Sequence, residues 1–245
     1  MKVIITRPSP DAEDFAAEIA GAGVTAIISP VMAIRPRAGE IDLAGVGALA
    51  FTSSNGVRVF AGLSGERNLK TFAVGAATVA AARREGFSDI ASAAGDVESL
   101  ADLITISKPY MPVLYLAGSE RAGDLVGLLA ERGLAARRAV IYDAVEIAAP
   151  SPIAAAALAE NPADCVVVFF SPRSARLFIR QARAAGAEKS LSAAVALCMS
   201  AEIGAAADEI AWARIEISQH RAAEAMARLV EAEKSARNRR TGKSR

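Results

Sequence analysis

The sequence predicts an α/β protein of two similar domains, each built on a parallel sheet. Short apolar runs alternate with amphipathic segments along most of the chain, which is the pattern of strands alternating with helices. The chain also contains two internal repeats. An offset of 110 residues aligns Lys2–Val31 with Pro112–Ile141 without a gap, and Phe51–Phe60 matches Phe169–Phe178. Repeats of this length exceed solenoid units, so they favour duplicated domains.

Each predicted strand is a run rich in apolar residues, as expected where helices cover both faces of a parallel sheet. The expected strands span residues 2–6, 24–29, 48–52, 72–74, 90–93, 113–117, 137–145, 165–170, 193–199 and 215–217. Proline and glycine separate these runs from the segments between them.

The segments between the strands carry helix start and stop signals. Ser53 directly precedes an amphipathic segment, as an N-cap residue does, and Gly23, Gly86 and Gly133 follow the ends of others. The expected helices span residues 11–20, 54–63, 79–85, 97–106, 125–132, 152–161, 174–185, 202–207 and 221–233.

The two repeats give the chain the order A–B–A′–B′, with A of about 35 residues and B of about 60. We align Val74–Thr78 with Leu197–Ala201 as the continuation of the B repeat. From these patterns alone, A pairs with either B or B′.

Composition limits the class of protein. Hydrophobic residues make up 53% of the 245 residues and charged residues 22%, which excludes a disordered chain. No apolar run approaches the roughly 20 residues of a membrane span, and the first residues lack a signal peptide, so we expect a cytoplasmic protein. Cys165 and Cys198 lack the spacing of a metal or redox site, and we expect two buried structural thiols.

The charge is unevenly distributed. The last twelve residues carry six basic residues and no acid, which leaves the rest of the chain at −5 against a total of +1. A basic globular surface for nucleic acid is therefore absent. We expect residues 234–245 to be a solvated disordered tail, with binding to RNA or a membrane surface as the alternative.

Six segments together resemble the uroporphyrinogen-III synthase family, through their order and spacing rather than through any one of them. They are Ile-Thr-Arg-Pro-x-x-x-Ala at 5–12, Phe-Thr-Ser-x-Asn-x-Val at 51–57, Val-Gly-x-Ala-Thr at 74–78, Gly-Asp-x-Glu-x-Leu at 95–100, Val-Ile-Tyr-x-x-Val at 140–145 and Phe-Phe-Ser-Pro-x-x-Ala at 169–175. The resemblance covers roughly residues 1–232.

The resemblance implies two flavodoxin-like α/β domains joined by a two-stranded antiparallel linker. A discontinuous domain would combine residues 1–34 with 149–233, and an inserted domain would span 37–142, so that A pairs with B′ and B with A′. The linkers would be residues 31–37 and 140–148, and 234–245 the tail.

The resemblance also implies the activity. Members of the family close the linear tetrapyrrole hydroxymethylbilane with inversion of its last ring, ring D, and loss of water, giving uroporphyrinogen III in haem biosynthesis. The reaction needs no metal or cofactor. We expect a monomer that takes its substrate from hydroxymethylbilane synthase, without nucleic acid or a membrane span as partner.

The substrate carries many carboxylates, whereas the globular part is net acidic, so we expect helix N-termini to bind it. Hydroxyl and glycine residues follow several predicted strands, where parallel sheets bind ligands, and Arg7 adds a cation. The predicted substrate-binding residues, which would face one substrate from two domains, are Arg7, Ser53, Ser54, Asn55, Gly75, Thr78, Gly118, Ser119, Ser171 and Ser200. The alternatives are ordinary N-caps and, for Arg7, a surface salt bridge.

The departing hydroxyl needs a proton donor. Tyr142 matches the tyrosine of the family's Val-Ile-Tyr segment, and we predict that its phenol donates to the leaving oxygen. The alternatives are a packing role for Tyr142, and catalysis that arises mainly from positioning of the substrate. His220, the only histidine, lies outside the matching segments, and we expect it at the surface.

One segment departs from the family. Cys198-Met199-Ser200-Ala201 stands where Gly-Pro-x-Thr is common, so a glycine and a hydroxyl are missing, although Ser200 supplies one. This departure favours a second hypothesis, a weakened or non-catalytic tetrapyrrole- or anion-binding protein on the same scaffold. A Rossmann nucleotide enzyme is disfavoured because no GxGxxG or Walker sequence follows a strand.

Overall fold

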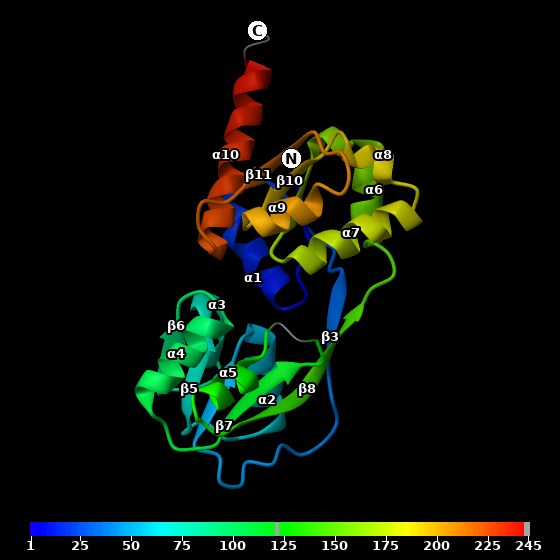
Figure 1. Ribbon diagram of the computed structural model, residues 1–245. Coiled ribbons are helices and arrows are strands. Elements are labelled where there is room, and N and C mark those ends of the chain that lie inside the picture. Colours follow the sequence, from blue (N-terminus) through cyan, green and yellow to red (C-terminus); the bar gives the residue numbers. More distant parts are fainter. Residues whose placement is uncertain (121–122, 243–245) are drawn as a thin grey trace. The chain divides into compact units, whose positions relative to one another are not determined.

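The computed structural model describes residues 1–120 and 123–242 (Figure 1). The chain divides into two compact units, Met1–Ala33 with Val145–Arg245 as unit 1, and Ile34–Ala144 as unit 2. Each unit is built on one sheet with helices on both faces. The predicted α/β class with parallel sheets is therefore confirmed.

Unit 1 is built on a five-stranded parallel sheet in the order β11-β10-β9-β1-β2. Its strands are β1 (Lys2–Ile5), β2 (Thr25–Ile28), β9 (Cys165–Phe169), β10 (Val195–Cys198) and β11 (Arg214–Ile217). Its helices are α1 (Asp11–Glu18), α6 (Pro152–Glu160), α7 (Pro172–Ala184), α8 (Glu188–Leu191), α9 (Ala201–Ala207) and α10 (Ala223–Gly242), with 3-10 turns at Ala20–Ala22 and Pro162–Asp164. Counted along unit 1, this strand order is 2-1-3-4-5, that of flavodoxin-like folds.

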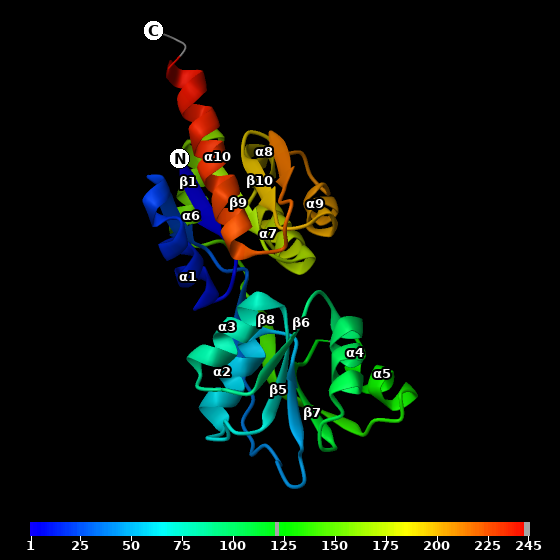
Figure 2. The ribbon, with the colours of Figure 1, turned by 90° about the vertical axis from the view of Figure 1, so that its left-hand side faces the viewer.

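Alternate residues of the unit 1 strands pack on opposite faces of the sheet. Val3, Ile5, Val166 and Val168 pack against α1 and α10, which lie side by side on that face (Figure 2). Helices α7 and α9 contact each other on the opposite face. Because both faces are covered, the strand residues that point to either face are apolar. This explains the continuous apolar runs of the sequence.

Unit 2 is built on a six-stranded sheet in the order β3-β8-β7-β4-β5-β6. Its strands are β3 (Met32–Pro36), β4 (Ala48–Phe51), β5 (Lys70–Val74), β6 (Ile90–Ala93), β7 (Val113–Gly118) and β8 (Ala136–Glu146). Its helices are α2 (Ser54–Leu63), α3 (Gly75–Arg84), α4 (Val97–Ser107) and α5 (Leu125–Glu131). Helices α2 and α3 cover one face and α4 and α5 the other (Figure 2).

Strands β3 and β8 each contain residues of both units. The amide of Arg37 donates to the carbonyl of Ile141 at 2.8 Å, and the amide of Ile147 donates to the carbonyl of Val31 at 3.0 Å. The residue numbers rise along one strand as they fall along the other, so the two strands run antiparallel.

The registers of the two sheets reproduce the internal repeats. Val3 pairs with Val166 in unit 1, and Val113 pairs with Ala48 in unit 2. These two pairs are equivalent under the repeats found in the sequence. The structure therefore joins A with B′ and B with A′, the arrangement that the family resemblance implies.

The proposed continuation of the B repeat was wrong by two residues. Phe51 pairs with Ala73 in unit 2, and its counterpart Phe169 pairs with Cys198 in unit 1. The equivalent of Cys198 is therefore Ala73, whereas the sequence alignment gave Gly75. A shift of two residues keeps every strand side chain on the same face, so the hydrophobic pattern does not detect it.

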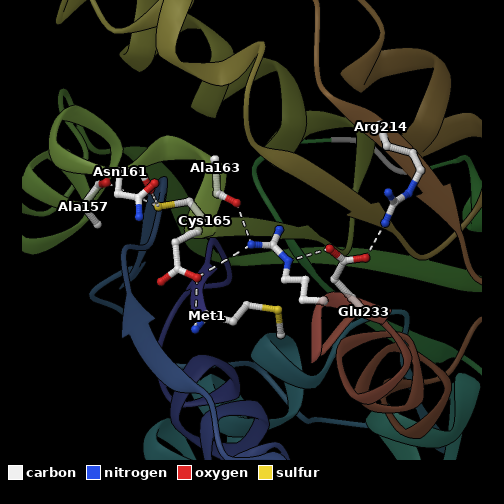
Figure 3. Close-up of polar contacts among 9 residues, drawn as sticks. Met1, Ala157, Asn161, Ala163, Cys165, Arg214 and Glu233 are labelled. Carbon is white, nitrogen blue, oxygen red and sulfur yellow. Dashed lines mark hydrogen bonds and ion pairs between the residues drawn. The ribbon is translucent and has the colours of Figure 1, made fainter. Parts of the chain in front are cut away.

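The expected disordered tail was also wrong over residues 234–242, because α10 continues to Gly242. Arg237, on the extended part of α10, donates to Glu233 Oε1 at 2.6 Å and to the carbonyl of Ala163 at 2.6 Å, and it lies 3.7 Å from Asp164. Glu233 also pairs with Arg214 of β11, as Figure 3 shows. Charge density alone predicted solvation, but the contacts of Arg237 with Ala163 and Asp164, outside the helix, hold the first turn of the segment.

Single residues behave largely as the sequence predicts. Cys165 and Cys198 are buried free thiols, and burial raises the pKa of Cys198 to about 12. His220 is exposed. Among the described residues, no helix has both the length and the apolar composition that crossing a membrane requires.

We predict that Glu233→Ala lowers the free energy of unfolding by about 2 kcal/mol. Glu233 is 7% exposed, and its loss leaves the guanidiniums of Arg214 and Arg237 without their shared carboxylate. Urea unfolding measures the change. Glu231→Ala is the matched control on an exposed position of the same helix, with an expected change within about 0.5 kcal/mol. Equal effects of the two substitutions would contradict the anchoring of α10.

Candidate active site

The candidate site of unit 2 lies where neighbouring parallel strands end. Strands β8, β7, β4 and β5 are adjacent, and the turns after β7, β4 and β5 leave from the same edge of the sheet. From β4 the chain continues toward β5, and from β7 it continues toward β8, in the opposite direction. The edge between β4 and β7 is therefore the switch point at which open α/β sheets bind ligands.

The turn after β4 forms the N-terminus of α2. Ser53 is the N-cap, with extended backbone, and its hydroxyl accepts a hydrogen bond from the amide of Asn55 at 3.2 Å. Arg58, one turn later, donates to Ser54 Oγ at 3.2 Å and to Asn55 Oδ1 at 2.8 Å. The predicted residues Ser54 and Asn55 are therefore held by a cation of their own helix, and Ser54 is almost fully buried.

Tyr142 lies beside this turn, in contact with two glycines of neighbouring elements. A Cβ at Gly118 would come within 2.8 Å of the Tyr142 ring, and one at Gly56 within 3.8 Å. The amide of Ser119 donates to the carbonyl of Tyr142 at 2.9 Å. Glycine at 118 is thus needed for the ring to lie against the end of β7.

The phenol of Tyr142 stays protonated at neutral pH. Burial raises its pKa above the ordinary value of 10, and a hydrogen bond with the Ser53 side chain opposes part of this rise. Tyr142 is 9% exposed and belongs to the core cluster that includes Phe51 and Ile141. The side chain therefore packs in the core, as the alternative prediction has it, and at the same time keeps a proton that it can donate.

A charged pair stands next to the tyrosine. Arg37 donates to both carboxylate oxygens of Asp143, at 2.9 and 2.7 Å. This fork, with a hydrogen bond from the Ser119 side chain, lowers the pKa of Asp143 to about 2. Asp143 is therefore ionised at neutral pH and orients Ser119 beside Tyr142.

The turn after β5 differs, because its helix starts earlier than expected. Helix α3 begins at Gly75, which has a φ of 78°, and not at Val79. The structure describes all of α3, and no side chain caps its N-terminus. Ala76 and Ala77 are exposed. Thr78 is buried, with only 4% of the residue exposed. This turn thus presents backbone N–H groups and not a hydroxyl.

In unit 1 the predicted site residues follow β1, β9 and β10. Arg7 donates to Asp11 Oδ2 at 2.9 Å, and its guanidinium lies over the Phe170 ring at 4.5 Å. Ser171 caps α7 through a capping box with Ser174, and Ser200 caps α9. Arg7 therefore makes an ion pair within the protein, and both serines are N-caps.

The structure thus gathers the candidate residues into two groups, one at the strand ends of each unit. Unit 2 brings together Tyr142 and the residues at 53–55, 75, 78, 118 and 119. Unit 1 carries Arg7, Ser171 and Ser200. The expected polar turn at 118–121 is described only as far as Glu120, since Arg121 lies outside the described residues.

Comparison with known proteins identifies the family. The family model described as uroporphyrinogen-III synthase HemD matches residues 13–228. The chain belongs to the uroporphyrinogen-III synthase family. A curated relative, the uroporphyrinogen-III synthase of Chlorobaculum parvum, is 27% identical over 190 residues, which cover 72% of this chain and 77% of the relative.

Two solved structures of uroporphyrinogen III synthases share the fold. The Helicobacter pylori protein has a TM-score of 0.65 and 18% identity, with 94% of this chain and 98% of that chain covered. A mutant protein from the extremely thermophilic bacterium Thermus thermophilus has a TM-score of 0.53 and 17% identity, with 98% and 99% covered. The family predicted from the sequence is therefore confirmed. So is the predicted enzyme class, a cyclising lyase of tetrapyrrole biosynthesis.

Sequence reasoning missed three residues of the candidate site. Arg58, Arg138 and Asp143 each bind a predicted residue or its turn. Arg58 follows Ser54 by four residues on a helix, a spacing that brings side chains together and was available from the sequence. Arg138 and Asp143 act across strands, and no sequence spacing indicates their contacts.

We predict that Gly118→Ala displaces the Tyr142 ring and slows formation of uroporphyrinogen III. The added Cβ would overlap the ring, so we also expect a loss of about 1–3 kcal/mol in the free energy of unfolding. Gly62→Ala is the matched control, because a Cβ at this position of α2 meets nothing within 4 Å. Turnover and stability of Gly118→Ala equal to those of the control would contradict the placement of Tyr142 against Gly118.

Proposed function

We propose that the protein binds hydroxymethylbilane and closes it to uroporphyrinogen III with inversion of ring D and loss of water. The observation that carries the proposal is the family match over residues 13–228. The position of Tyr142 supports it, because a protonated phenol lies beside Ser53 and Gly118 at the strand edge where such sheets bind ligands.

Substrate carboxylates bind at the helix N-termini of unit 2. The globular part of the chain is net acidic, so the attraction is local and comes from backbone N–H groups and helix dipoles. Helix α3 supports this assignment best. It has ten residues, no capping side chain among its described residues, and small residues in its first turn.

Tyr142 donates its proton to the leaving hydroxyl. A hydroxide ion is a poor leaving group, and protonation in the transition state is the usual contribution of a general acid. The raised pKa keeps the phenol protonated, and Ser53 orients it. Because burial makes the phenol a weaker acid, we expect a partial contribution, with positioning of the two reacting carbons supplying the rest.

Arg7, Ser171 and Ser200 bind further carboxylates of the substrate. Arg7 is held by Asp11 and stacked on Phe170, so its guanidinium is oriented in advance, and its side chain keeps 18% exposure. A guanidinium offers five N–H donors, more than one carboxylate uses. Ser171 is half-buried at the N-terminus of α7, a helix of 13 residues.

We further propose a monomer in the cytoplasm that receives its substrate from hydroxymethylbilane synthase. The bilane cyclises on its own when released, so direct transfer would protect it.

The experiment is incubation of the purified protein with freshly made hydroxymethylbilane. The products, uroporphyrinogens I and III (isomers I and III), are then separated. We predict isomer III well above the spontaneous background. For Tyr142→Phe we predict a turnover number lowered by up to about 10²-fold, the low end of what general acids contribute, because burial makes this phenol a weaker acid. Tyr110→Phe, at a position 88% exposed, is the matched control and keeps full turnover.

Two results would count against this account. Isomer I alone would refute the enzyme activity and leave the non-catalytic binding protein as the better interpretation. Isomer III formed by Tyr142→Phe at the rate of the Tyr110→Phe control would remove the tyrosine from the proton-donor role and leave its packing role.

A further inference from the structure

Arg138 holds the turn that follows β7. It lies on β8 four residues before Tyr142, and the β7–β8 ladder shifts its register between the two residues. Its Nη2 group is in hydrogen-bond contact with the carbonyl of Gly118, and it lies 3.3 Å from the carbonyl oxygen of Ser119 and 3.4 Å from that of Glu120. Three successive carbonyls thus converge on one cation.

The strand pairing explains why the turn needs this cation. The ladder between β7 and β8 is regular from Val113 to Ala117 and then shifts, so that Gly118 stands opposite Tyr142. Beyond this shift the chain leaves the sheet, and the register between the two strands ends. The Nη2 group of the guanidinium takes the place of a strand partner for the carbonyls of the turn.

The same cation acts on the tyrosine. Gly118 contacts the Tyr142 ring, and Ser119 is bonded to the Tyr142 carbonyl through its amide. The charge of Arg138 lowers the pKa of Tyr142 and so opposes the effect of burial. Arg138 therefore affects both the position of the phenol and its acidity, while its hydrogen bonds go to the carbonyls of the turn.

We propose that Arg138 is a positioning residue of the reaction, which holds the Gly118–Glu120 turn against Tyr142 and thereby sets the phenol for proton donation. This inference rests on the proposed function, in which Tyr142 is the donor. The competing explanation is that Arg138 only stabilises the fold of unit 2.

Arg137 provides the matched control. It is the adjacent residue of β8 with the same charge, but its guanidinium donates to Asp42 Oδ2 at 2.7 Å and to the Asp42 carbonyl at 2.6 Å. These bonds tie it to the segment before β4 and not to the Gly118 turn. Removing Arg137 therefore removes a strand arginine and its ion pair, but does not change the surroundings of Tyr142.

The experiment compares Arg138→Ala, Arg138→Lys and Arg137→Ala in the full chain by two measurements. The first is kcat and KM for isomer III. We expect Arg138→Ala to lower kcat by about tenfold or more with KM changed less than about twofold, because misplacement of a catalytic group costs rate more than binding. Arg138→Lys keeps the charge but not the planar guanidinium, so we expect it to recover part of kcat. Arg137→Ala keeps kcat.

The second measurement does not depend on activity. Protein labelled with ¹³C at the ζ carbon of tyrosine gives one NMR signal for each of the three tyrosines, and Tyr142→Phe assigns that of Tyr142. We expect Arg138→Ala to shift the Tyr142 signal and leave that of Tyr110, while Arg137→Ala leaves the Tyr142 signal unchanged.

An unmoved Tyr142 signal in Arg138→Ala, or a kcat equal to that of Arg137→Ala, would overturn the inference. If the wild-type protein forms no isomer III, the proposed function fails, while the NMR comparison still decides whether Arg138 positions the tyrosine. If Arg138→Ala does not fold, Arg138→Lys decides. A shifted Tyr142 signal with reduced kcat then supports the inference, and wild-type values of both overturn it.

Discussion

The parallel pairing of β4 with β7 and of β1 with β9 determines where the candidate site residues lie. Each pair joins strands from distant parts of the chain, with Ala48 opposite Val113 and Lys2 opposite Cys165. Because all these strands point the same way, the turns that follow them leave one edge of each sheet. Apolar packing on both faces drives this pairing, and the grouping of polar turns follows from it without any attraction between the polar residues themselves.

Tyr142 shows how the site depends on close packing. Its ring fills the space that glycines at 56 and 118 leave open, and its hydroxyl reaches the N-cap of α2. Burial keeps the phenol protonated, whereas Ser53 and Arg138 act in the opposite direction. The same environment therefore gives the tyrosine a packing role and a chemical one, and the two alternatives predicted from the sequence do not exclude each other.

Much of the fold was predictable because the duplication appears directly in the sequence. Helix α2 begins at Ser54 and ends at Leu63 as predicted, since a serine cap precedes a clear amphipathic pattern. Equivalent pairs such as Val3–Val166 and Val113–Ala48 then follow from the two repeats. The resemblance to the family supplied the choice between the two possible pairings.

The remaining differences have physical causes. A register shift of two residues preserves the faces of a strand, so the sequence pattern could not align Cys198 with Ala73. The extension of α10 depends on Arg237 meeting Ala163 and Asp164, which lie outside the helix. The contacts of Arg138 depend on a register shift at the end of β7. Each of these is a tertiary effect without a local signal.

Titration of ¹⁵N-labelled protein with uroporphyrinogen III, followed by backbone amide NMR, tests the central claim most directly. If the ligand binds at the strand ends that carry Tyr142, the amides of Asn55, Ala76 and Ser119 shift, and those at the opposite ends of the same strands, Lys70 and Val113, do not. Shifts confined to Lys70, Val113 and their neighbours, with Asn55 and Ser119 unchanged, would contradict the account.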